Sequence, residues 1–557
     1  MSSAWVAAAV WVPLLAAVLL LALTGKPRAQ RALSLGAGAF TLLIAAGLLA
    51  ATRRGEILVV ALGGWSPEVG IVWVADALAA LMLFFASVVS CASLVYSSGA
   101  LRGPREERYF YPLLQLMMVG VNGSLLTGDL FNLFVFFEIM LLASFALLAL
   151  GARPGGARPA IAYVVVNLVA SALFLGGVGA IYGATGTVNL ALLAIHLRAP
   201  SPPDVLWPAA ALVLVVFLLK AALAPLFLWL PDAYPEASPV VNGLFAGLLT
   251  KVGVYALFRV VPLMGAAAPL GLRSALLPIA GATMLIGVVG ALGRTTIRGI
   301  LSFHIVSQVG YMIFGLALLS PMALAAGLFH AAHNMIAKTA LILAGGIAES
   351  VGGSGKLGEV RGLSRSHPWV AVAFLVPALS LSGLPPLSGF WGKLWLVVAG
   401  VRGGAYVVAG LSLAVGLLTL ASMLKIYSAT FWGEVAGQRA PAAGHDRGAL
   451  GATLSLGAVT ILLGILVGPV FAHLERTAAA LLQVTPYVEA VLGMEPRASA
   501  SGPWPCVSLP PSAAATIRTA NGNGCRSSGA ATLAKCNSRC RSAHHAVAIE
   551  RRSAGAT

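Results

Sequence analysis

Long apolar segments are the feature of this sequence that most restricts its fold. About fourteen of them are roughly 20 residues long, the length that a helix needs to cross the hydrocarbon core of a bilayer. They begin near Ala4, Arg31, Ile71, Tyr111, Leu130, Pro159, Leu206, Val240, Arg273, Gly299, Met322, Trp369, Tyr406 and Ala449. Charged residues make up only 10% of the chain, whereas soluble proteins usually contain about 25%. We therefore predict an all-α polytopic membrane protein with about 14 transmembrane helices.

Basic residues beside the first segment predict its orientation. No basic residue precedes the segment, whereas Lys26, Arg28 and Arg31 follow it, so it does not resemble a signal peptide and we expect it to be retained. Because cytoplasmic loops are enriched in Lys and Arg, the amino terminus is predicted to lie outside. The formal net charge of +17 reflects this loop pattern and a basic tail, and no nucleic-acid-binding motif accompanies it.

The composition changes after residue 495. Residues 496–557 are rich in Ser, Ala, Gly and Arg, and they contain four of the five cysteines. Without apolar periodicity this segment is predicted to be a disordered basic tail. Cys536 and Cys540, with His544 and His545 nearby, do not match a standard zinc-ligand spacing. We therefore divide the chain into a transmembrane domain over 1–495 and a tail, and predict no metal site.

Charged side chains interrupt six of the apolar segments near their middle. These residues are Glu138, Lys220, Lys251, Lys338, Lys393 and Lys425. A charge at bilayer depth costs at least about 2.5 kcal/mol, so such residues usually face a protein interior or a wet cavity. Lys425 lies near Trp432 and could instead extend its ammonium group to the membrane surface. The group as a whole indicates a path for ions.

Prolines predict breaks in two of these segments. Pro225 follows Lys220 by five residues, and Pro385 and Pro386 precede Lys393. Proline removes a backbone donor and disturbs the preceding turn, and interrupted helices at matching positions of two halves indicate a transporter's ion site. The spacing predicts two inverted five-helix repeats, at about 111–260 and 273–432, in which Lys251 matches Lys425. Ordinary proline kinks, which are common in membrane helices, remain the alternative.

A set of polar residues offers further candidate positions for proton transfer. His330, Asn334 and Lys338 follow one another at intervals of four residues, which places them on one helix face. His333 lies beside them, but no acidic residue joins the two histidines in a metal-binding pattern. His304 is either another proton-transfer position or a hydrogen-bonded packing residue. Asp76 is equally open between a structural and a functional role.

Sequence motifs for bound cofactors are missing from the membrane portion. It contains no nucleotide-binding loop, dinucleotide fingerprint, nucleophile elbow, haem motif or iron–sulfur spacing. We therefore predict no cofactor and no redox centre in this chain, and any electron transfer would belong to a partner.

Several runs of residues resemble the antiporter-like subunits that respiratory complex I shares with the Mrp cation/proton antiporters. The similarity covers about 70–435, and its runs extend from Phe131 to Glu138, Leu219 to Pro239, Leu249 to Gly253 and Leu384 to Gly389. The first run and the segment from Ser302 to Tyr311 more closely resemble the D subunits of Mrp antiporters.

The resemblance implies a fourteen-helix subunit with two inverted repeats. It implies that Glu138 and Lys220 form the key pair of a first half-channel, that Lys251 links the halves, and that His330, Lys338 and Lys393 serve the second. It also implies an Na⁺/H⁺ antiporter subunit in a bacterial inner membrane, which works with other membrane subunits. The alternative is a proton-pumping subunit of complex I or of a membrane-bound hydrogenase. A purely structural scaffold is disfavoured by the cost of its buried charges.

Overall fold

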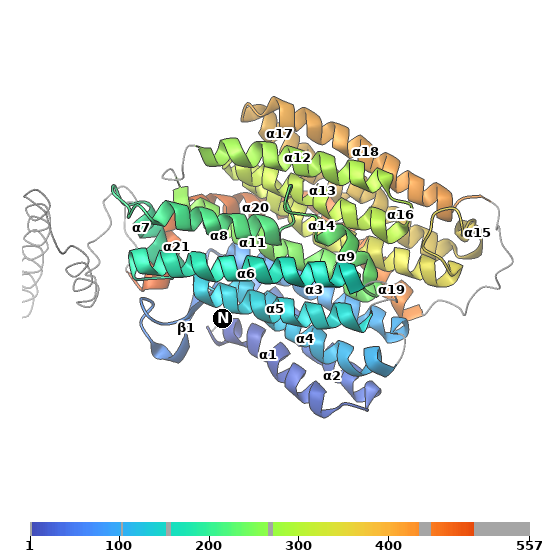
Figure 1. The fold of residues 1–557 in the computed structure, drawn as a ribbon, viewed down its shortest axis with the longest axis horizontal. Coiled ribbons are helices and arrows are strands. Elements are labelled where there is room, and N and C mark those ends of the chain that lie inside the picture. The colour runs from blue at the N-terminus through green and yellow to red at the C-terminus, as the bar shows by residue number, and fades with distance from the viewer. Residues whose placement is uncertain (1–2, 102–103, 152–156, 266–270, 434–446, 495–557) are drawn as a thin grey trace, which may run out of the picture. The chain divides into compact units, whose positions relative to one another are not determined.

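Helices form most of the described part of the protein (Figure 1). The computed structural model describes residues 3–101, 104–151, 157–265, 271–433 and 447–494, except the side chains of 104–107. The predicted tail lies outside these residues, as do its cysteines. The first helices are α1 (Ala4–Ala22), α2 (Pro27–Thr52), α3 (Ala77–Ala100), α4 (Pro104–Leu126), α5 (Leu130–Leu150), α6 (Ala157–Thr185), α7 (Leu190–Leu197) and α8 (Leu206–Lys220). Further along the chain are α9 (Leu230–Ala233), η2 (Tyr234–Glu236), α10 (Pro239–Leu244), η3 (Phe245–Leu249), α11 (Thr250–Met264), α12 (Gly271–Gly293), α13 (Ile297–Ala317), α14 (Pro321–Gly352), α15 (Leu363–Ser366), α16 (Pro368–Ser382), α17 (Ser388–Arg402), α18 (Tyr406–Thr430), α19 (Arg447–Ile465), α20 (Val467–Leu482) and α21 (Val484–Leu492).

Eleven segments of the described residues are helical, long and apolar enough to cross a membrane. They are α1, α2, α3, α5, α6, the segment from α10 to α11, α12, α13, α14, α18 and α19. Two further apolar helices, α8 and α16, are shorter. The predicted polytopic helical membrane protein is therefore confirmed.

A small β-hairpin that the sequence analysis did not predict accompanies the helices. Strand β1 (Leu58–Ala61) pairs antiparallel with β2 (Val72–Ala75), with η1 (Leu62–Gly64) between them. The segment predicted to be helical from about Ile71 therefore begins as a strand, and α3 starts only at Ala77. Val72 and Val74 are β-branched residues, which fit a strand well. Asp76 then caps α3, because its carboxylate accepts the backbone N–H of Ala79 at 2.9 Å.

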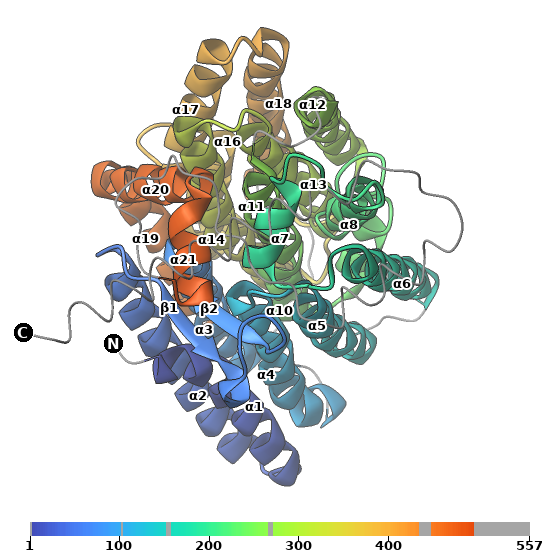
Figure 2. The same ribbon diagram turned by 90° about the vertical axis from the view of Figure 1, so that its left-hand side faces the viewer.

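The helices that carry Lys251 and Lys338 lie inside the bundle. In the apolar segment from α10 to α11, 100% of the residues are buried within the protein, and in that of α14 83% are buried. In the apolar segments of α2 and α18 only 33% are buried. Figure 2 shows α14 between α1 and α2 on one flank and α17 and α18 on the other. Helix α14 contacts α3, α10, α13, α16, α17, α19 and α20, so it forms the centre of the polar interior.

Both proline-containing segments interrupt helices. Helix α8 ends at Lys220, and Ala222 adopts a positive φ of 60°. The hydroxyl of Thr283 accepts the Ala224 N–H at 3.0 Å, which satisfies one backbone donor of the break. Helix α16 ends at Ser382, where Gly383 adopts the left-handed conformation (φ 91°) that favours glycine. Helix α17 resumes at Ser388.

Candidate functional site

Glu138, Ser171 and Lys220 form a continuous hydrogen-bonded group on three helices. The Ser171 hydroxyl of α6 donates to the Glu138 carboxylate of α5. The Lys220 ammonium of α8 donates to the Ser171 oxygen at 3.0 Å and to the Asn167 carbonyl at 3.3 Å. The two residues that the sequence predicts to work as a pair are therefore joined by a serine. Sequence reasoning did not identify Ser171, because a single serine in an apolar helix does not indicate a function by itself.

Helix α11, which carries Lys251, packs closely on the end of α8 at Gly253. A Cβ on Gly253 would lie 2.7 Å from the Ala221 nitrogen and 2.9 Å from the Lys220 carbonyl carbon, so only glycine permits this approach. The Lys251 ammonium donates to the Ala246 carbonyl at 2.5 Å. Ala246 belongs to η3, a π-helical turn, and such turns often occur at functional sites.

Lys338 occupies the centre of α14 and is fully buried, with 0% of its surface exposed. Among the described residues its ammonium has no hydrogen-bond partner, and neither side-chain atom of the neighbouring Asn334 has one. Helix α14 packs against α10 and η3, which precede Lys251, and its Thr339 hydroxyl donates to the Gly243 carbonyl at 3.1 Å. The structure therefore continues the polar group from α11 to α14.

The histidines of α14 contact two further helices, α13 and α17. His330 Nε2 lies 3.0 Å from the Gln308 oxygen of α13, and its ring lies 5.1 Å from that of Tyr311. His333 Nδ1 lies 2.9 Å from the Ser388 hydroxyl at the start of α17. Both histidines therefore face the polar interior, and they contact side chains that sequence reasoning missed.

Lys393 uses the break between α16 and α17. Its ammonium donates to the Ser382 carbonyl at 3.1 Å and lies 5.0 Å from the centre of the Tyr311 ring. Ser382 is the last residue of α16, and carbonyls at a helix end lack intrahelical partners. The break thus supplies an acceptor to a buried cation.

His304 also belongs to this interior. It is fully buried, and its Nε2 lies 2.8 Å from the Ser422 hydroxyl of α18. The hydrogen-bonded packing role considered from the sequence is therefore present in the structure.

Lys425 and Asp76 make structural contacts away from the buried lysines. Lys425 donates to the carbonyls of Leu292 and Arg294 at 2.7 and 2.9 Å, where α12 ends. Asp76 receives two hydrogen bonds from Arg259 of α11, at 2.5 and 2.7 Å. Burial alone would raise the pKa of this carboxyl, but the Arg259 guanidinium and the backbone N–H groups hold it below its usual value. Sequence reasoning missed Arg259. Its position on the same helix as Lys251 is the feature that could have identified it.

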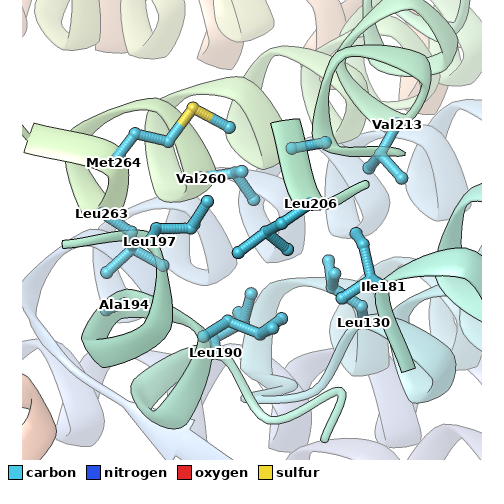
Figure 3. Close-up of a pocket in the computed structure, with 12 residues that line it drawn as sticks. Leu130, Ile181, Leu190, Ala194, Leu197, Leu206, Val213, Val260, Leu263 and Met264 are labelled. Atoms are coloured by element: carbon cyan, nitrogen blue, oxygen red, sulfur yellow. The ribbon is translucent and has the colours of Figure 1, made fainter. Parts of the chain in front are cut away.

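Neither a metal cluster nor the apolar pocket in Figure 3 adds chemistry to this site. Among the described residues, no three His, Cys, Asp or Glu side chains group as metal ligands would. The pocket has a volume of about 20 Å³, and aliphatic residues such as Leu130, Leu190, Leu206 and Met264 line it. It therefore contains no polar group that could bind an ion.

Comparison with known proteins identifies relatives along most of the chain. The sequence family described as NADH:quinone oxidoreductase/Mrp antiporter matches residues 127–419. The D subunit of the Na⁺/H⁺ antiporter of Alkalihalophilus pseudofirmus is 42% identical over 463 residues, which cover 83% of this chain and 94% of that protein. A chain of the Mrp complex from a Dietzia species superposes with a TM-score of 0.82 and 35% identity, covering 88% of this chain and 99% of its own length. A chain of respiratory complex I from Thermus thermophilus gives a TM-score of 0.75 and 25% identity, with coverages of 86% and 99%.

Proposed function

The chain belongs to the NADH:quinone oxidoreductase/Mrp antiporter family, and we propose that it is the D subunit of a multisubunit Na⁺/H⁺ antiporter. The family resemblance predicted from the sequence is thereby confirmed. Identity of 42% along nearly the whole length of a D subunit is the observation that carries this assignment. The chain is a transporter subunit rather than an enzyme, and it acts with the other membrane subunits of an Mrp complex.

The alternative is a proton-pumping subunit of complex I or of a hydrogenase. Its support is the shared fold, which the chain from Thermus thermophilus complex I matches at 25% identity. That identity is well below the value for the antiporter D subunit, so the antiporter assignment is favoured. The genes beside this one would separate the two, because the two complexes have different partner subunits.

For the whole subunit we propose about fourteen membrane crossings. These comprise the eleven apolar segments together with α4, α8 and the interrupted pair α16 and α17. The amino terminus lies outside, and residues 1–495 form the proton-translocating domain. Its two inverted repeats cover about 111–260 and 273–432. The two helix breaks, each beside a buried lysine, support this internal symmetry.

The buried polar groups serve as a proton relay in this proposal. Glu138 and Lys220 control access, Lys251 and Lys338 pass the proton between the halves, and Lys393 with His330 governs its release. At an effective dielectric of about 20, a unit charge about 7 Å away changes the energy of another by roughly 2.4 kcal/mol. A protonation change at one residue therefore alters the protonation of the next, and this coupling lets protons move along the group.

Unpaired polar atoms support a hydrated interior around this relay. They are Thr250 Oγ1, Gln308 Nε2, Asn334 Nδ2 and Oδ1, Lys338 Nζ, His304 Nδ1, His330 Nδ1 and His333 Nε2, and each is buried without a protein hydrogen-bond partner among the described residues. Buried polar groups are normally satisfied by protein or by ordered water. We therefore propose that water joins the residues whose side chains do not touch.

Removal of either member of the first pair tests the function. The whole complex, with Glu138→Ala or Lys220→Ala, is expressed in a host that lacks its own sodium exporters. Both variants should assemble but lose salt tolerance and Na⁺-driven proton flux in inverted vesicles. Asp232→Asn, at an exposed carboxylate with 59% of its surface accessible, is the control. Normal flux in either assembled variant would overturn the relay assignment.

A further inference from the structure

A cavity with several polar side chains in its wall lies at the end of the bundle where α2 ends and α3 begins. Its volume is about 130 Å³, and its walls include Glu56, Asp76, Arg259, Thr477 and Tyr487. Glu56 and the neighbouring Gly55 are exposed. The cavity therefore lies between solvent-exposed residues and a buried ion pair.

Arg259 is held rigidly at the inner wall of this cavity. Its guanidinium forms both hydrogen bonds to Asp76, and the two side chains are only 5% and 13% exposed. It also lies over the rings of Tyr255 and Tyr487, at 5.5 and 5.3 Å. A guanidinium remains protonated in proteins, and its planar shape suits two-point pairing with a carboxylate. Arg259 thus holds a permanent positive charge against the Asp76 carboxylate, and the two side chains together carry no net charge.

The same helix leads from this cavity to the proposed relay. Lys251, Tyr255 and Arg259 follow one another at intervals of four residues on α11, which places them along one side of the helix. Eight residues of helix span about 12 Å. Arg259 also donates to the Tyr255 hydroxyl at 3.1 Å. A cation or proton that passed from the cavity to Lys251 along this side would have to pass the guanidinium.

We propose that Arg259, by neutralising the buried carboxylate of Asp76, blocks the leak of protons and sodium ions through this end of the relay. The inference rests on the proposed antiporter function and adds a means of keeping it coupled. An antiporter works only if neither ion leaks, and fixed positive charges exclude protons and cations from membrane pores. The charge of Arg259 produces the block, and the ion pair with Asp76 fixes where that charge lies.

Two substitutions that break the same ion pair separate this proposal from a purely structural role. Arg259→Gln leaves Asp76 with a local charge of −1, whereas Asp76→Asn leaves Arg259 with +1. The measurement is the decay of a pH gradient in inverted vesicles that contain the whole complex, at pH 8 and without added Na⁺. We expect the pH gradient to decay about tenfold faster with Arg259→Gln. At a dielectric near 20, one unit charge about 10 Å away changes the probability that a cation occupies this part of the path by roughly that factor. Asp76→Asn should decay no faster than the wild type, because it leaves the positive charge of Arg259 in place and repels a passing cation.

The controls address folding and the antiporter assignment separately. Arg294→Gln breaks an exposed ion pair with Asp232, in which the side chains are 42% and 59% exposed, and should leave the decay unchanged. Equal leaks in Arg259→Gln and Asp76→Asn would show a structural role and overturn the proposal, as would wild-type decay in assembled Arg259→Gln.

If Arg259→Gln does not assemble, Thr477→Asp and Thr477→Asn decide the matter, since they differ in charge but little in shape and leave the ion pair intact. Faster decay with Asp than with Asn would support the block, and equal decay would refute it. Na⁺-driven flux in wild-type vesicles tests the antiporter function independently of these leaks.

Discussion

Ser171 gives the relay a specific prediction at the scale of single residues. Its hydroxyl is the connection between Glu138 and Lys220, and hydrogen bonds to charged groups contribute about 1.5–3 kcal/mol. Ser171→Ala should therefore reduce Na⁺-driven proton flux by about tenfold or more, because 1.4 kcal/mol corresponds to a factor of ten. The pH profile of the flux should shift as well, and Ser171→Thr should restore much of the activity.

Ser144→Ala is the matched control for this substitution. Ser144 is also a buried serine, but its hydroxyl pairs with Tyr163 at 2.6 Å. This variant should keep the wild-type pH profile. An unchanged flux and pH profile in Ser171→Ala would show that Glu138 and Lys220 do not communicate through this hydroxyl.

Single residues differ in how visible they are to sequence reasoning. Glu138 and the buried lysines stand out because a charge in an apolar segment is costly and therefore rare. Ser171 and Ser388 could not be singled out, because serine occurs throughout membrane helices and carries no charge. Asp76 shows a third case. Its charge was visible, but its role depends on Arg259, which is 183 residues away in the sequence.

At the scale of secondary-structure elements, Lys425 is predicted to stabilise the end of α12. Its ammonium satisfies the carbonyls of Leu292 and Arg294, and positive charge is favourable at a helix carboxyl terminus. Lys425→Met should lower the melting temperature of the detergent-solubilised complex, with a loss of about 1–3 kcal/mol, while Na⁺-driven flux continues.

Lys393→Met provides the comparison, because it removes a lysine assigned to the relay. That variant should abolish the flux. If Lys425→Met abolished flux in a complex of normal stability, Lys425 would belong to the relay and its role as a cap would be insufficient.

The boundaries of elements were predictable where residue chemistry marks them. Pro225, Pro385 and Pro386 indicated the two breaks because proline cannot continue a helix normally. The hairpin was missed because the strand from Val72 to Ala75 continues directly into an apolar helix. A short apolar run cannot be assigned to strand or helix by periodicity alone. The π-helical turn before Lys251 had no recognisable signal either.

At the scale of the whole molecule, the proposed orientation predicts which loops are accessible from each side. Ser66 lies in the exposed connection between β1 and β2, and Ser366 is exposed at the end of α15. In a background without the five native cysteines, Ser66→Cys in intact cells should react with a membrane-impermeant thiol reagent. Ser366→Cys should react only after the membrane is opened. The reverse pattern would invert the topology.

The number and character of the membrane helices followed from composition, but their arrangement did not. Apolar segments predict a bundle because each must bury its backbone polar groups in helical hydrogen bonds. They do not predict that α14 lies at the centre, since its neighbours α3 and α20 are distant in sequence. The close approach of Gly253 to Lys220 and Ala221 likewise depends on packing between separate helices.

The central claim is that the buried charged residues share one hydrated path, and an experimental density map of the complete complex at a resolution that shows water tests it most directly. The account predicts ordered waters that join Lys220, Lys251, Lys338 and Lys393 through the polar atoms of α13 and α14. Apolar side chains that fill the space between these lysines and exclude water would contradict it.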